Sequence, residues 1–283
     1  MGARACISIP VHESPAVVLD QVANIRAFLP DAIVVLHVAQ SFVAPEQLAP
    51  LLPDGVYVNE TSLRTEWGDP SPAHKANFRF IDARERFDVF VLGASNDLFV
   101  RRDADRRLAQ ADAGVQLFPC HPGQTRREVA SFALAAADPG MARLAGGGTV
   151  YQSQPEGMFF ERSLFRRMVA EIEAALGTEP RPFVTHDSFW GPEHYAYPTI
   201  AARLADAIVP PILYSEVQGT LDRRPISEAV IWAISRRWRS SPVSSASVDS
   251  PAVPTPCSAT CRRCRRRLAP CCGSMQPTQR SSP

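Results

Sequence analysis

The feature that most constrains this chain is the run Ala32-Ile-Val-Val-Leu-His-Val38. A run that is apolar at nearly every position is typical of a strand buried on both faces of a parallel sheet. Residues 16–29 before it carry apolar side chains at helical spacing, and residues 5–10 alternate as a short strand. The order strand, helix, strand at this spacing predicts a doubly wound, Rossmann-like α/β domain.

Later segments extend this pattern. Further strands are expected at residues 55–58 and 87–93, and the strands at 5–10, 32–38 and 87–92 are expected to be adjacent and parallel. A strand is expected at 149–161, and helices are expected at 73–86, 103–112, 126–137, 163–176, 198–208 and 225–238. Because ligands bind outside the carboxyl ends of such strands, the expected binding loops are 11–15, 38–42, 59–72 and 93–97.

The composition divides the chain near Ser240. Residues 1–239 carry the apolar residues of a single folded domain, whereas Ser, Pro, Arg and Cys dominate residues 240–283. Such a composition buries too little apolar surface to offset chain entropy. We therefore expect residues 240–283 to be a disordered Ser/Pro/Arg/Cys-rich tail.

Removing this tail should leave the domain intact. We expect truncation after Ser240 to change the melting temperature by no more than about a degree or two, because no apolar burial is lost. Thermal unfolding of the full chain and the truncated chain measures the difference. A large drop would mean that the cysteines of the tail stabilise the fold.

Charge, hydropathy and cysteine content exclude several classes of protein. Residues 240–283 hold six arginines and one aspartate, which leaves 24 basic and 28 acidic residues before them. The domain is thus mildly acidic, unlike a nucleic-acid binder. No apolar run approaches the ~18 residues of a membrane span. Only Cys6 and Cys120 precede the tail, so we expect a cytoplasmic protein without a disulfide framework.

Four segments carry a family resemblance through their order and spacing. They are Ile7-Ser-Ile-Pro-Val-His-Glu13, Ile33-Val-Val-Leu-His-Val38, the stretch from Val56 through Trp67-Gly68 to Ser95-Asn-Asp-Leu-Phe-Val-Arg101, and Gly191-Pro-Glu-His-Tyr-Ala-Tyr-Pro-Thr-Ile200. The last segment is the most specific. Together they make residues 5–205 resemble the core-2/I-branching β-1,6-N-acetylglucosaminyltransferases.

The resemblance implies a mixed sheet of the GT-A nucleotide-sugar transferase type. It also implies an inverting, metal-independent transfer of a sugar, such as N-acetylglucosamine, from a nucleotide-sugar donor to a hydroxyl of a glycan or polysaccharide. The nucleotide-sugar would be a co-substrate, and no other cofactor is implied. Ala39 stands where the family has an aspartate that meets the nucleotide. This departure leaves open an alternative, a catalytically inactive protein that binds nucleotide-sugars or glycans.

The resemblance also supplies candidate catalytic residues. An inverting transferase needs a carboxylate that takes the proton of the acceptor hydroxyl. Glu193 falls on the acidic positions of the last motif, and His194 beside it is a second proton acceptor near pH 7. A helix N-terminal cap is the alternative role for Glu193. Arg223 and Arg224 are candidates by position for holding the donor phosphates.

Four further residues are candidates for donor or acceptor binding. Asp97 follows the strand at 87–93, where it either touches a ligand or makes an Asx turn. His12 follows the first strand and is either a ligand contact or a satisfied loop histidine. Trp67 either stacks on a sugar ring or anchors its loop. Glu156 either hydrogen-bonds an acceptor sugar or has a structural role.

Two sequence patterns match metal-binding motifs, but neither is expected to bind a metal. Asp103-Ala-Asp105 has the letters of an Asp-x-Asp motif, but it lies past the strand end at the start of a helix, where Asp103 suits an N-cap. Cys257-x3-Cys261-x2-Cys264 has the spacing of a radical-SAM iron–sulfur loop, but no sequence follows that could build the required barrel. We expect exposed thiols there and no metal site.

Overall fold

The computed structural model of the protein describes residues 2–12, 14–38, 48–63, 70–95, 97, 99, 104–121, 130–178, 183–184 and 189–212. Residues 213–283 lie outside the described residues, so the tail beyond Ser240 and the helix expected at 225–238 stay predictions.

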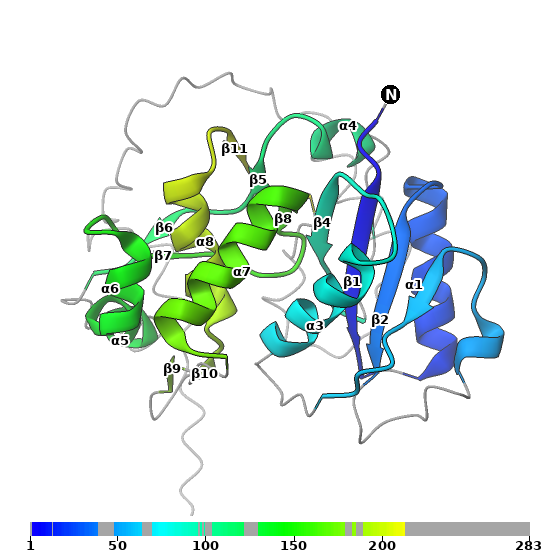
Figure 1. The fold of residues 1–283 in the computed structure, drawn as a ribbon, viewed down its shortest axis with the longest axis horizontal. Coiled ribbons are helices and arrows are strands. Elements are labelled where there is room, and N and C mark those ends of the chain that lie inside the picture. Colours follow the sequence, from blue (N-terminus) through cyan, green and yellow to red (C-terminus); the bar gives the residue numbers. More distant parts are fainter. Residues whose placement is uncertain are drawn as a thin grey trace, which may run out of the picture. The chain divides into compact units, whose positions relative to one another are not determined.

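In the described part of the chain, seven strands form one mixed sheet in the order β11-β5-β8-β4-β1-β2-β3 (Figure 1). Their bounds are β1 Ala5–Val11, β2 Ile33–Val38, β3 Val56–Val58, β4 Val89–Leu92, β5 Ala113–Gly114, β8 Phe159–Glu161 and β11 Ile208–Val209. Strand β1 pairs in parallel with both β2 and β4, which confirms the predicted adjacency. Strand β8 runs antiparallel to β4 and β5, so the expected mixed α/β fold class is confirmed.

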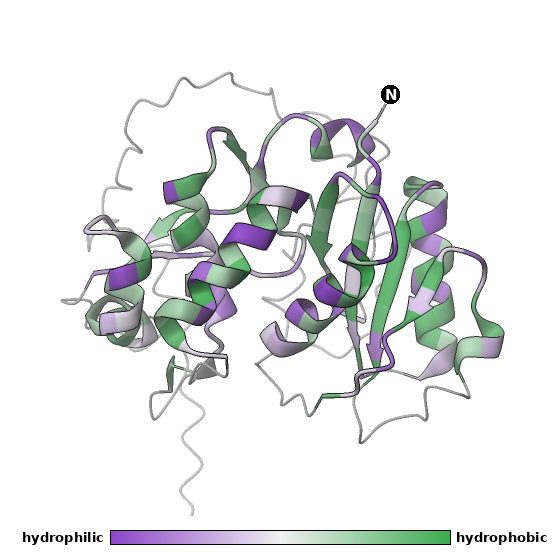
Figure 2. Ribbon diagram, in the orientation of Figure 1, coloured by the Kyte–Doolittle hydropathy of each residue, from purple (hydrophilic) through white to green (hydrophobic). Residues whose placement is uncertain are grey.

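Side chains of the central strands alternate between two hydrophobic cores. Cys6, Ile33 and Val35 face a core that includes residues of α3 (Ser71–Asp82), α5 (Ala130–Ala137), α6 (Pro139–Ala145), α7 (Arg162–Leu176) and α8 (Glu193–Leu204). Ile7 and Val34 face the opposite core, which includes residues of α1 (Pro15–Phe28). Because both faces are covered, β1, β2 and β4 are hydrophobic along most of their length (Figure 2).

Several shorter elements complete the described chain. They are η1 Ala49–Leu51, α4 Ala104–Leu108, α5 Ala130–Ala137, α6 Pro139–Ala145, β6 Phe118–Pro119, β7 Tyr151–Gln152, β9 Phe183–Val184 and β10 Phe189–Trp190. The single strand expected at 149–161 is instead β7 and β8, which lie in different sheets. A turn at residues 155–157 separates them, and Gly157 has a φ of 78° there, a conformation that glycine adopts without steric cost.

The start of α8 also differs from the prediction. The helix expected at 198–208 begins at Glu193, so Pro198 lies inside it. Proline has no backbone N–H, which leaves the carbonyl four residues earlier without its helical partner. That carbonyl belongs to His194, and it accepts a hydrogen bond from the backbone N–H of Ser153 at 2.8 Å. The proline is tolerated because a residue beside β7 satisfies the carbonyl that it leaves free.

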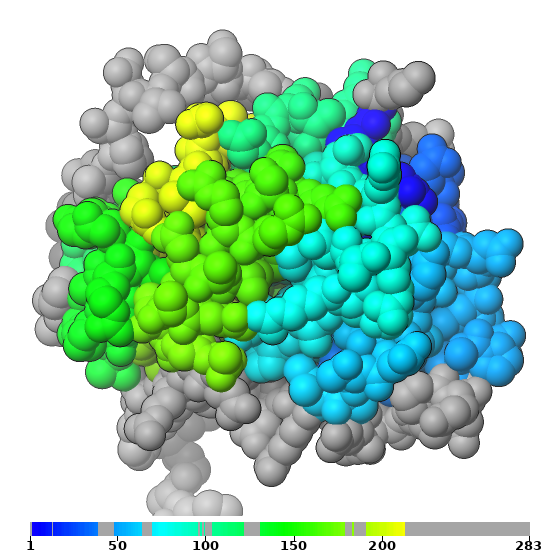
Figure 3. All heavy atoms as spheres, in the orientation of Figure 1, coloured from blue at the N-terminus to red at the C-terminus, as the bar shows by residue number. Residues whose placement is uncertain are grey.

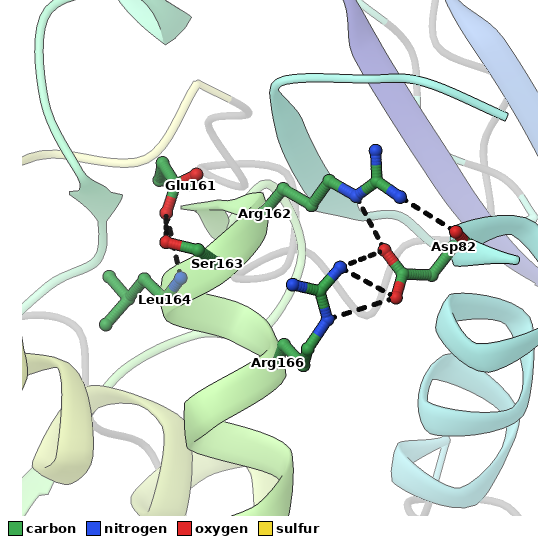
Figure 4. A network of polar contacts seen from close by, with 6 residues as sticks. All are labelled: Asp82, Glu161, Arg162, Ser163, Leu164 and Arg166. Carbon is green, nitrogen blue, oxygen red and sulfur yellow. Dashed lines mark hydrogen bonds and ion pairs between the residues drawn. The ribbon is translucent and has the colours of Figure 1, made fainter.

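Two arginines connect α3 to α7 on one face of the sheet. Arg162 Nε donates to Asp82 Oδ1 at 2.6 Å, and Arg166 Nη2 donates to the same oxygen at 2.8 Å (Figure 4). Glu161 caps α7 by accepting from the backbone N–H of Leu164 at 2.8 Å. The α3 and α7 regions, drawn in cyan and green, meet directly at the surface in Figure 3. Asp82 therefore joins the end of α3 to the first turn and a half of α7 through ion pairs.

Candidate functional site

Polar side chains gather where β1 and β4 end. Ser95 Oγ lies 3.1 Å from His12 Nδ1, so the residues that follow the two parallel strands are in contact. Asp97 Oδ2 accepts the backbone N–H of Ala94 at 2.8 Å, and Gln21 of α1 donates to the Ala94 carbonyl. Asp97 thus closes a local turn through the backbone of a residue three positions earlier, and its side chain remains partly exposed.

Glu156 reaches the same edge from the turn before β8. The backbone N–H of Gly157 donates to the Leu92 carbonyl at 2.8 Å, and the Leu92 N–H donates to the Met158 carbonyl at 2.8 Å. These bonds fasten the turn to the end of β4. Gln154 Nε2 donates to Glu156 Oε2, which holds the carboxylate in place. The structure therefore brings Glu156, Asp97 and His12 to one edge of the sheet.

Burial and the nearby Glu156 carboxylate shift the titration of Asp97. Burial raises the pKa of the Asp97 carboxyl to about 7, the Ala94 N–H opposes the rise, and the negative charge of Glu156 adds to it. Near neutral pH Asp97 is therefore present both as the carboxylate and as the neutral acid. A neutral carboxyl can donate a hydrogen bond to a ligand oxygen, whereas a carboxylate can only accept one.

This raised pKa predicts a pH-dependent contribution to stability. Folded Asp97 binds a proton more readily than unfolded Asp97, so the carboxyl reduces the free energy of unfolding progressively as the pH rises from about 4 to about 7. Asp97→Asn keeps an oxygen for the Ala94 N–H but cannot ionise. Between about pH 5 and pH 8 we expect the wild type to lose roughly 2 kcal/mol more than the variant, measured by urea unfolding. Equal losses of unfolding free energy in the two proteins would contradict a raised pKa for Asp97.

Glu193 and His194 open α8. The Glu193 side chain is 0% exposed, and its Oε1 lies 3.7 Å from His194 Nε2. His194 Nδ1 lies 3.3 Å from the carbonyl oxygen of Ser153, so Nδ1 carries the proton and donates. Burial lowers the pKa of His194 to about 4, against the opposing effect of the Ser153 carbonyl. His194 is therefore neutral near pH 7 and a weaker base than an ordinary histidine.

The remaining predicted residues differ in what can be said of them. Trp67, Arg223 and Arg224 lie outside the described residues, so their roles stay predictions. Ser153 connects α8 to the candidate site, since it bonds to His194 and directly precedes the segment from Gln154 to Glu156. Over the described residues, no three His, Cys, Asp or Glu side chains are grouped to hold a metal ion. The expected metal independence also stays a prediction.

A cavity of about 830 Å³ opens at the opposite edge of the sheet. It lies beside the amino ends of β1 and β4, and its lining includes Asp88, Asp112, Glu161 and Arg162. Asp105 of the Asp-x-Asp pattern also lies on this side, next to Gly2. This cavity is therefore separate from the strand ends that carry the predicted site residues.

Sequence reasoning missed a group of polar residues buried against the sheet. Ser8, His37, His74 and Asn77 are each at most 2% exposed. A signal for the first two is present in the sequence. Alternate residues of a strand point to the same face of the sheet. Ser8 is two residues after Cys6, and His37 is two residues after Val35, so both polar side chains point to the face that carries α3. A polar residue within such a buried strand requires a hydrogen-bond partner from the layer or the segment that covers it.

Comparison with known proteins gives structural likeness only. No protein-family model matches the sequence, and no curated protein matches it. The chain is similar to a mannosyltransferase from Pyrobaculum calidifontis in complex with GDP-Man and Mn²⁺, with 16% identity, a TM-score of 0.43, and coverage of 83% of this chain and 61% of that one. It is also similar to TarS 1-349 of S. aureus, with 10% identity, a TM-score of 0.42, and coverage of 74% and 58%.

A third similar structure is 4-diphosphocytidyl-2C-methyl-D-erythritol synthase, with 12% identity, a TM-score of 0.44, and coverage of 82% of this chain and 99% of that one. The chain thus spans about three fifths of the length of the first two structures. These likenesses are distant, and the fold assignment rests on the strand order and register of the sheet. The resemblance to the core-2/I-branching family stays a prediction. In the described ranges no helix is long and apolar enough to cross a membrane.

Proposed function

We propose that this chain is a glycosyltransferase that moves a sugar from a nucleotide-sugar donor to a hydroxyl of a glycan acceptor. The observation that carries the proposal is the gathering of His12, Asp97 and Glu156 at the carboxyl ends of β1 and β4. Open α/β sheets bind their ligands at this edge. Carboxylates and a histidine there supply the hydrogen-bonding groups that sugar hydroxyls and a ribose need.

The finer proposal is an inverting transfer, with N-acetylglucosamine as the candidate sugar. Glu193 takes the proton of the acceptor hydroxyl, the acceptor oxygen attacks the anomeric carbon, and the nucleoside diphosphate leaves with the electron pair of the broken bond. Arginine side chains stabilise the negative charge of the departing diphosphate, and Arg223 and Arg224 are the candidates for this role. The support for Glu193 and these arginines is the sequence resemblance.

A second function is favoured by one structural observation. The Glu193 side chain is 0% exposed, so in this conformation an acceptor hydroxyl does not reach its carboxylate. A protein that has lost catalysis but still binds nucleotide-sugars or glycans needs no accessible base. Ala39, in place of the family's aspartate, agrees with this alternative.

A transfer assay separates the two functions. The wild type is incubated with a panel of UDP-, GDP- and dTDP-sugars and a panel of glycan acceptors, and products are detected by mass spectrometry. The proposed enzyme yields a product whose new anomeric bond is inverted relative to the donor. A retained configuration would contradict the inverting mechanism. Binding of a donor without any product would support the inactive binding protein instead.

A further inference from the structure

Five polar side chains are buried between the sheet and α3, on the face that α3 covers in Figure 1. They are Ser8 of β1, His37 of β2, Asn59 after β3, and His74 and Asn77 of α3, and each is at most 2% exposed. Burying polar groups is unfavourable unless hydrogen bonds replace those made with water. The hydrogen bonds of these five side chains therefore identify the segments that the group holds together.

The inner part of the group joins α3 to the two central strands. Ser8 Oγ and His74 Nδ1 are 2.8 Å apart, and Asn77 Nδ2 lies 3.1 Å from both Ser8 Oγ and the Val35 carbonyl. Asn59 Nδ2 donates to Asn77 Oδ1 at 3.1 Å. Burial lowers the pKa of His74 to about 3, with His37 adding to the effect. The network is therefore uncharged at neutral pH.

The outer part of the network ends on the backbone of residues 59–63. Asn59 Oδ1 accepts the backbone N–H of Thr61 at 3.0 Å. His37 Nε2 accepts the backbone N–H of Leu63 at 2.9 Å. Two buried side chains thus hold the segment that follows β3 against the end of β2.

The bond to Leu63 fixes the protonation of His37. An amide N–H needs a lone pair on Nε2, so the ring is neutral and carries its proton on Nδ1. Within the described ranges, no group meets hydrogen-bond geometry with this buried Nδ1. An apolar residue of similar size would leave no such donor unsatisfied. The contribution of the imidazole to this site therefore lies in the bond from Nε2 to the Leu63 amide.

We propose that His37 is a positioning residue, whose neutral ring holds residues 59–63 at the carboxyl edge of β2 and β3 for the nucleoside part of a nucleotide ligand. The nucleotide half of this inference rests on the proposed function. The geometric half does not, because it concerns a hydrogen bond within the free protein. In open α/β sheets the ligand lies outside the strand ends, and residues 59–63 border the ends of β2 and β3.

Acid should release this segment. Burial lowers the pKa of His37 from the ordinary value of 6.5, so the ring is neutral at neutral pH and gains a proton only in acid. Protonation places a hydrogen on Nε2, which then faces the N–H of Leu63 and cannot accept from it. His74 is the titratable neighbour on α3 and is itself neutral. Glu60 in the positioned segment is exposed.

Two substitutions separate the hydrogen bond from the packing. His37→Gln supplies an oxygen that can accept the Leu63 N–H, whereas His37→Leu supplies none. Ile81→Val, elsewhere in the core on α3, is the matched control. Amide hydrogen exchange by NMR is then measured in the free proteins. We expect exchange at Leu63 to accelerate at least about tenfold in His37→Leu and to change by less than about threefold in the other two variants.

The exchange result decides the geometric half. Unchanged exchange at Leu63 in His37→Leu, or the same acceleration in Ile81→Val, would overturn it. If His37→Leu does not fold, the Leu63 amide of the wild type is followed as the pH is lowered from about 7.5 to the acid limit of the folded protein, because protonation of His37 removes the same lone pair without changing the shape of the ring. In His37→Gln the Leu63 amide should then lack the added acid sensitivity, and equal sensitivity of both proteins would overturn the assignment.

The nucleotide half is tested with UDP, GDP and dTDP as probes in titration calorimetry. We expect the dissociation constant of the nucleotide that binds to rise about tenfold in His37→Leu and to stay within about threefold in His37→Gln and Ile81→Val. Equal affinity of the wild type and His37→Leu would overturn positioning for the nucleoside. If the wild type binds none of the three probes, the proposed function and the nucleotide half both fail, and the exchange experiment still judges the hydrogen bond.

Discussion

Replacing Glu193 by glutamine is expected to reduce sugar transfer by roughly a hundredfold or more, because a general base contributes about that much to such a step. Glutamine keeps the size of the side chain at this buried position but cannot take a proton. The dissociation constant of the donor should stay within about twofold, since the base acts on the acceptor. Steady-state transfer rates and donor titrations measure the two effects.

Glu171→Gln is the matched control for this experiment. Glu171 lies on the surface of α7, where it pairs with Arg203. Its substitution should leave the rate of sugar transfer unchanged. If Glu193→Gln retains the wild-type rate, the base is elsewhere. Glu156 is then the next candidate, because it is partly exposed and acts on Asp97 at the candidate site. In that case Glu156→Gln should show the hundredfold loss.

Replacing Phe165 by alanine should reduce the free energy of unfolding by about 3–5 kcal/mol. Phe165 of α7 is 0% exposed. Its ring centroid lies 4.7 Å from that of Phe90, 4.9 Å from that of Phe78 and 5.6 Å from that of Tyr197. The ring thus joins β4, α3 and α8 in one core, so its removal leaves a cavity among three elements. Urea unfolding of the wild type and the variant measures the loss.

Phe118→Ala is the control for the loss of an aromatic ring. Phe118 lies on β6 and is 51% exposed, so its removal should change the free energy of unfolding by less than about 0.5 kcal/mol. Similar losses in the two variants would contradict the central role of Phe165 in the core. A small loss for Phe165→Ala alone would indicate that the neighbouring aromatic rings refill the space.

The central strands were predictable because their chemistry is local. The apolar run in β2 and the alternation in β1 indicate buried strands whatever packs on them, and their parallel pairing with β4 follows from the helices between them. The start of α8 was not predictable in this way. A proline favours a helix boundary, and the Ser153 N–H that accommodates Pro198 lies 45 residues earlier in the chain.

The candidate site was predictable in position but not in its contacts. The rule that ligands bind at strand ends selects His12 and Asp97 from the sequence, and the structure places both at one edge. The effect of Glu156 on the pKa of Asp97 depends on the turn that Gly157 makes against β4. No sequence spacing reveals that effect, because the two carboxylates are 59 residues apart.

The most direct test of the account is ligand-detected NMR binding of a panel of sugar nucleotides to the wild type and to His12→Ala/Asp97→Ala. The account predicts saturation transfer from the wild type to at least one sugar nucleotide, and at least about tenfold weaker binding to the double variant. Glu171→Gln should bind like the wild type. A panel in which no sugar nucleotide binds the wild type, or in which the double variant binds equally well, would contradict the claim that these strand ends form a nucleotide-sugar site.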